Sequence, residues 1–151
     1  MKKNKEIIRA LEDAYFKELE TVQNYIANSV NLDGVRAEEI KSALATDVTE
    51  ELGHAQQLAR RIKVLGGIVP GSASFKARQK DLQPSKDTTD VVSVIRGVIA
   101  AEEDAIDGYK KLIKLCDGED YVTQDLAITL LADEEEHCTM FRGFLKEYTR
   151  K

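Results

Sequence analysis

The sequence contains only two histidines, and each follows a glutamate by three residues inside a stretch with helical periodicity. One pair is Glu51 and His54, and the other is Glu134 and His137. Residues three apart lie on one face of an α-helix, so each pair can present a carboxylate and an imidazole to the same neighbour. A charge run such as the one from Asp133 to His137 usually faces solvent, and the surrounding apolar pattern decides between the two interpretations.

Apolar residues recur at steps of three and four in four long segments, which predicts four amphipathic helices. We place these helices at about residues 5–31, 36–65, 88–117 and 121–149. Glycines between the segments break the pattern, and Thr88, Thr89 and Asp90 can cap the third helix. Four amphipathic helices of matched length predict an all-α fold, a four-helix bundle.

The connection between the second and third helices, about residues 66–87, is polar and rich in Gly, Ser, Lys and Pro. A connection of about twenty residues is unusual in a compact domain unless it has a role. It can run the length of the bundle and make the second and third helices parallel, with one helical turn near residues 75–80. We therefore predict a single domain, residues 1–151, with a long crossover.

Each predicted helix places an acid on its apolar face near mid-length. The ionisable residues on these faces are Glu18, Glu51, His54, Glu102, Glu134 and His137. The two halves of the chain also repeat, because Tyr25 follows Glu18 by seven residues and Tyr109 follows Glu102 by seven. In each half a Glu-x-x-His motif comes next, as in an internal duplication around a pseudo-twofold axis.

Four carboxylates and two imidazoles buried together repel one another unless they are paired or coordinate metal. Two divalent cations neutralise four glutamates, and one imidazole per ion with oxygen ligands suits Fe(II), Mn(II) or Zn(II). We therefore predict that the six residues form a catalytic pair of metal sites, in which carboxylates of the Glu18 or Glu51 type bridge the ions. Tyr25 and Tyr109 are expected to be core residues hydrogen-bonded to carboxylates.

Other acids lie off the apolar faces and are expected to meet solvent or an assembly surface. They are Glu20, Glu50, Glu103, Glu135 and Glu136.

Composition narrows the remaining choices. The net charge of −5 disfavours nucleic acid as a partner and is compatible with cation handling. Two cysteines are too few for a disulfide scaffold, and no secretory leader or membrane span is evident, so we expect a cytoplasmic protein. Cys116 is expected at the end of the third helix, opposite the start of the fourth, and Cys138 about 20–25 Å away along the fourth helix. That separation is too large for a disulfide, which favours buried free thiols.

With these residues identified, the chain resembles the ferritin-like superfamily over about residues 5–148. The similar segments, shared with bacterioferritins and archaeal-type Dps-like proteins, are Glu18 to Tyr25, Glu51 to His54, Glu102, and Asp133 to His137. The resemblance implies a ferritin-like four-helix bundle with a ferroxidase centre of two iron ions in each subunit. The implied activity is oxidation of Fe(II) by O2 or peroxide, with Fe(III) stored inside a hollow homo-oligomer.

The resemblance also implies a role for each ligand. Glu18 and Glu102 are implied as terminal ligands, and Glu51 and Glu134 as bridges. His54 and His137 are each implied to bind one iron ion.

Two departures from the bacterioferritin pattern change what is expected. Bacterioferritins place a haem-binding methionine directly after the second-helix ligand glutamate, but this chain has Leu52, so we expect no haem. Bacterioferritins also extend beyond the fourth helix with a short fifth one, whereas this chain ends at Lys151. A shell of 12 subunits is therefore favoured over one of 24.

Two other functions stay open. A rubrerythrin-like peroxidase would use an external electron donor, because the paired Cys-x-x-Cys module that usually serves it is absent. A Dps-like protein would protect DNA through Lys2, Lys3 and Lys5, although three lysines are ordinarily a solvated chain end.

Overall fold

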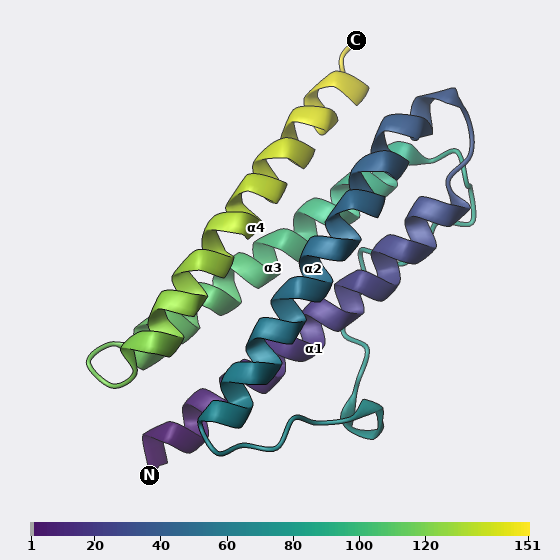
Figure 1. The fold of residues 1–151 in the computed structure, drawn as a ribbon. Helices are drawn as coiled ribbons and strands as arrows, with labels where there is room; N and C mark the ends of the chain where they lie inside the picture. The colour runs from purple at the N-terminus through teal and green to yellow at the C-terminus, as the bar shows by residue number, and fades with distance from the viewer. Residues whose placement is uncertain (1) are drawn as a thin grey trace.

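The computed structural model describes residues 2–151, which form four long helices and two short 3-10 turns (Figure 1). In chain order these are α1 (Lys2–Asn31), η1 (Val35–Ala37), α2 (Glu38–Val64), η2 (Ser72–Ser74), α3 (Val91–Cys116) and α4 (Tyr121–Tyr148). The predicted all-α four-helix fold is confirmed. No helix within residues 2–151 is both long and apolar enough to cross a bilayer.

The helices pair as two antiparallel hairpins, α1 with α2 and α3 with α4. In Figure 1 the crossover travels back along the bundle, so that α2 and α3 run in the same direction, as predicted. α1 packs against α3 and joins the two hairpins. All four helices therefore meet at mid-length, where the sequence places the six ionisable residues.

Helix ends follow ordinary capping chemistry. The side chain of Asp90 accepts a hydrogen bond from the Ser93 N–H at the start of α3, as its position predicted. Gly66, with a φ of 83°, follows the end of α2 in the left-handed conformation that glycine adopts most readily.

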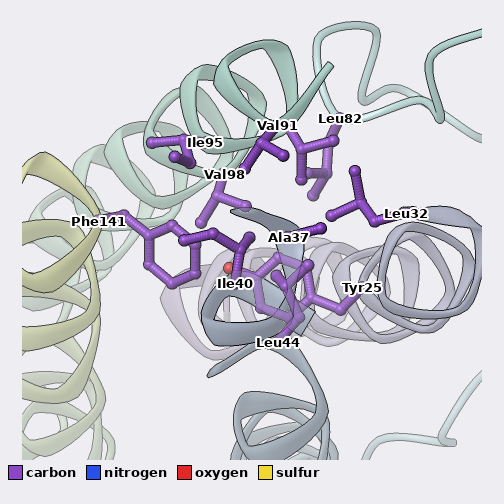
Figure 2. Close-up of a cluster of buried hydrophobic side chains, with 11 residues drawn as sticks. Tyr25, Leu32, Ala37, Ile40, Leu44, Leu82, Val91, Ile95, Val98 and Phe141 are labelled. Carbon is purple, nitrogen blue, oxygen red and sulfur yellow. The ribbon is translucent and has the colours of Figure 1, made fainter. Parts of the chain in front are cut away.

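Apolar packing is divided into two clusters, one toward each end of the bundle. The first (Figure 2) contains Tyr25, Leu32, Ala37, Ile40, Leu44, Leu82, Val91, Val94, Ile95, Val98 and Phe141. The second contains Ile7, Leu11, Leu58, Ile62, Tyr109, Leu112, Cys116, Ala127 and Leu130. The layer between them is left to charged side chains, which the clusters shield from water at both ends.

The crossover is anchored on α1 by a buried acid that the sequence did not reveal. The Glu20 carboxylate accepts hydrogen bonds from the backbone N–H groups of Arg78 and Gln79, at 2.6 and 2.9 Å. The prediction that Glu20 meets solvent or an assembly surface is wrong, because the crossover covers it. The helical turn expected near residues 75–80 is also misplaced: the turn forms earlier, at η2, since these two N–H groups are committed to Glu20.

Gly97 is required where the crossover touches α3. A Cβ at this position would lie 2.3 Å from the carbonyl oxygen of Asp81. We expect Gly97→Ala to lower the free energy of unfolding by about 1–3 kcal/mol, the usual cost of overpacking. Gly143→Ala is the matched control: nothing lies within 4 Å of its added Cβ, so it should raise stability by about 0.5–1 kcal/mol. Urea denaturation of both variants checks this, and equal effects would contradict the contact.

Candidate metal centre

The six predicted residues converge in the layer between the two apolar clusters. All four helices contribute, and each of the six residues is at most 6% exposed. Their candidate ligand atoms form two groups, and within each group these atoms all lie within 4.8 Å of one another. The first group is Glu18, Glu51, His54 and Glu134, and the second is Glu51, Glu102, Glu134 and His137. Glu51 and Glu134 belong to both groups. The structure thus arranges the side chains as two adjacent four-residue sets that share two carboxylates.

Around the first imidazole, three carboxylates face the same ring nitrogen. Nδ1 of His54 lies 3.0 Å from Glu134 Oε1, 3.6 Å from Glu51 Oε2 and 3.7 Å from Glu18 Oε2. The second imidazole repeats this arrangement.

Around the second imidazole, Nδ1 of His137 lies 3.1 Å from Glu51 Oε1, 3.7 Å from Glu134 Oε2 and 3.8 Å from Glu102 Oε1. Each half of the chain therefore supplies equivalent atoms, as the repeated motif indicated.

Two buried tyrosines hold the outermost carboxylates. The hydroxyl of Tyr25 donates to Glu102, and that of Tyr109 donates to Glu18. Burial, followed by the charges of Glu102 and Glu18 respectively, raises the pKa of each tyrosine well above its usual value, which keeps both hydroxyls protonated as donors. The predicted contact between each tyrosine and a carboxylate is confirmed.

Without a bound cation, the negative charge of the four carboxylates is reduced by protons bound to the carboxylates and the imidazoles. Burial, followed by the charge of Glu18, raises the pKa of Glu134 to about 10 and also raises the pKa of Glu51. Burial opposes ionisation of Glu18 too, but hydrogen bonds from Glu51 and His54 lower its pKa. Although burial opposes it, the surrounding carboxylates raise the pKa of both imidazoles.

Several of the candidate ligand atoms have no hydrogen-bond partner among residues 2–151, although they are buried. They are Glu51 Oε1, Glu102 Oε2, Glu134 Oε2 and His137 Nδ1. The His137 nitrogen is close to Glu51 but not aligned for a hydrogen bond. Buried polar atoms are almost always partnered, so these four fit a site that is completed by cations. Carboxylate oxygens with one imidazole per ion suit Fe(II), Mn(II) or Zn(II).

Further carboxylates, which we term the outer acids, contact the opposite nitrogens of the two imidazoles. His54 Nε2 lies 3.0 Å from Asp133 Oδ2. His137 Nε2 lies 2.9 Å from Glu50 Oε2 and 3.8 Å from Asp47 Oδ1. A carboxylate that accepts a hydrogen bond from the Nε2–H group keeps the proton on Nε2 and leaves Nδ1 free to bind a cation.

The sequence did not identify the outer acids as site residues. Glu50 is exposed, as predicted, yet it also contacts His137. Asp47 is buried on the apolar face of α2, and its partner lies on α4. Glu103, Glu135 and Glu136 are exposed, as predicted.

Removing an outer acid should weaken metal binding without removing a ligand. We expect Asp133→Ala to reduce the affinity for Co(II) by about 10–100-fold, because the His54 ring loses the partner that fixes its tautomer and orientation. Asp125→Ala, an exposed aspartate of the same helix, is the control. Anaerobic titration followed by visible absorbance measures both affinities, and an unchanged affinity in Asp133→Ala would contradict the role.

Both cysteines are buried free thiols, as predicted. Burial, with the charge of Asp120, raises the pKa of Cys116 to about 11, so this thiol stays protonated near neutral pH.

Comparison with known proteins supplies a second line of observation. A family model described as a ferritin-like domain matches residues 8–151. The chain is 38% identical over 91 residues to the bacterial ferritin of Neisseria meningitidis serogroup B, covering 60% of this chain and 53% of that protein. This match thus spans about half the length of that relative. The bacterioferritin of Brucella melitensis biotype 1 is 30% identical over 138 residues, covering 91% of this chain and 81% of that protein.

Among solved structures, the chain resembles the bacterioferritin-related protein from Bacteroides fragilis, which is described as a dodecameric thioferritin. The TM-score is 0.90 at 29% sequence identity, covering 97% of this chain and 88% of that one.

Proposed function

The chain belongs to the family of ferritin-like domains, and we propose that it is a ferroxidase of the iron-storing or iron-detoxifying kind. Its substrates are Fe(II) and either O2 or peroxide. The observation that carries this proposal is the pair of buried sets of candidate ligands that share Glu51 and Glu134, each of which also has a buried oxygen without a hydrogen-bond partner.

Each of the six residues has a role in this proposal. Glu51 and Glu134 bridge two iron ions, because each belongs to both ligand sets. Glu18 and Glu102 each complete one set as a terminal ligand, and their tyrosine partners hold them in place. Nδ1 of His54 and Nδ1 of His137 each bind one ion.

The chemistry that bound Fe(II) supplies is electron transfer to O2 or peroxide. The protein residues bind the ions side by side, and the two apolar clusters exclude water along the bundle axis. Mn(II) or Zn(II) can substitute for iron in binding, since the donor set suits them as well.

We also propose the setting in which this chemistry takes place. Residues 1–151 form one ferritin-like domain, and twelve copies assemble into a hollow shell that stores Fe(III). The description of the Bacteroides fragilis protein as dodecameric supports this number. No haem is expected at Leu52, and the two free thiols suit the cytoplasm.

One set of measurements on the purified chain tests the proposal. Anaerobic Co(II) titration should end at two ions per chain, and aerobic addition of Fe(II) should give oxidation faster than in buffer. Native mass spectrometry should report an assembly near twelve subunits that retains iron. A chain that binds no metal, or oxidises Fe(II) no faster than buffer, would defeat the proposal. Turnover of peroxide with an external reductant by a small dimer would instead favour the rubrerythrin-like alternative.

A further inference from the structure

A narrow cavity, which we term the throat, connects the α1–α3 face of the bundle with the buried centre. The four glutamates of the centre line it, together with the partly exposed residues Lys17, Gln79 and Ala105 and the exposed Asp104. Its volume is about 10 Å³, and such a space holds about one molecule the size of water.

Two wider cavities, with volumes of about 290 and 400 Å³, share lining residues with the throat. Lys17 and Asp104 line both of them and the throat as well. The Lys17 ammonium lies 3.0 Å from an Asp104 carboxylate oxygen. This ion pair therefore borders the throat and both wider cavities.

The walls of the throat are fixed by hydrogen bonds on one side and small residues on the other. The Gln79 amide donates to Thr21 Oγ1 at 2.7 Å and accepts from Asn24 Nδ2 at 2.9 Å. From α3, Ala101 and Ala105 line the throat. Their short side chains leave the space that a larger residue would fill.

Charge differs between the two sides of the centre. At the throat the Lys17 ammonium is paired with Asp104, so the unpaired acids that could attract a cation at the surface are not on this side, and the width excludes a cation that carries its water shell. On the α2–α4 side the outer acids Asp47, Glu50 and Asp133 reach the imidazoles, and none of them forms a salt bridge with a lysine or arginine within residues 2–151.

We infer that the throat admits the oxidant, a neutral molecule no larger than O2 or hydrogen peroxide, whereas Fe(II) reaches the centre past the outer acids on the α2–α4 side. This inference rests on the proposed function and adds to it separate entry routes for the two substrates.

Narrowing the throat tests the inference with probes other than turnover. Nitric oxide stands in for O2, and its binding to the anaerobic Fe(II)-loaded protein is followed by stopped-flow absorbance. Co(II) stands in for Fe(II), and its binding to the metal-free protein is followed in the same way. We expect Ala105→Leu to slow nitric oxide binding on the order of ten-fold, because the larger side chain fills a throat of about 10 Å³, and to leave Co(II) binding unchanged. Ala45→Leu, at an exposed alanine of α2, is the matched control.

Two further variants keep the test decisive. Ala105→Val narrows the throat less, for use if circular dichroism shows that Ala105→Leu does not fold. Lys17→Met removes the ion pair at the entrance, and we expect nitric oxide to bind at least as fast as in the wild type. Unchanged nitric oxide binding in a folded Ala105 variant would overturn the inference, as would slowed Co(II) binding. If the wild-type chain binds no Co(II), the proposed function itself fails, and this inference fails with it.

Discussion

Replacing Glu51 with alanine is expected to slow Fe(II) oxidation by on the order of 100-fold or more. Glu51 belongs to both ligand sets, and its two oxygens face His54 and His137 at 3.6 and 3.1 Å. Loss of a carboxylate that only orients a ligand already costs about 10–100-fold in metal affinity or activity, and loss of a shared ligand affects both ions. Stopped-flow absorbance of Fe(III) after aerobic mixing measures the rate, and Co(II) titration should show weakened binding at both sites.

A matched control separates this effect from the general loss of an acid. Glu103 adjoins the proposed ligand Glu102 on α3, but it is exposed and pairs with Arg142 at 2.7 Å. Glu103→Ala should therefore oxidise Fe(II) at the wild-type rate, whereas Glu102→Ala should not. If both Glu51→Ala and Glu102→Ala keep the wild-type rate while folded, the six residues are not the oxidation centre.

The six central residues could be predicted because their information is local. Each of the two Glu-x-x-His motifs lies within a single helix, and an acid that continues an apolar face of spacing three and four must point into the bundle. The same rule predicted that Glu103, Glu135 and Glu136 lie outside. Because all six residues lie on helices, packing the four apolar faces together is enough to bring the candidate ligands close to one another, whatever path the loops take.

The residues that were missed depend on contacts between distant segments. The burial of Asp47 follows from the same rule, because it continues the apolar face of α2, but its contact with His137 of α4 is recorded by no spacing within one helix. Glu20 was missed because its partners are backbone N–H groups of the crossover, whose irregular path has no periodicity. The ion pair of Lys17 and Asp104 likewise joins two helices that are far apart in the chain.

Loading the centre with divalent cations should raise the stability of the protein strongly. Two ions at about 100 times their dissociation constants contribute about 2.7 kcal/mol each, or about 5 kcal/mol together. For a domain of this size that corresponds to a rise of about 10–20 °C in Tm. The physical reason is that buried carboxylates which held protons in the metal-free protein become metal ligands. Thermal denaturation with Zn(II), and separately with EDTA, measures the difference.

This stabilisation should grow with pH, and the raised pKa values give the sign. In the metal-free protein Glu134 has a pKa of about 10, so between about pH 4.5 and 10 the folded state holds a proton that the unfolded chain releases. Stability of the metal-free protein therefore falls as pH rises through that range, and the raised pKa values of His54 and His137 act in the same direction. Metal binding requires deprotonated ligands, so metal affinity rises with pH over the same range in which the metal-free protein loses stability. The difference in Tm between the metal-loaded and the metal-free protein should be larger at pH 8 than at pH 6.

Glu134→Gln tests the role of this carboxylate, because glutamine keeps the shape of the protonated acid. In this variant the difference in Tm between the loaded and the metal-free protein should be smaller and vary less with pH. A difference equal to that of the wild type at both pH values would show that Glu134 is not a ligand.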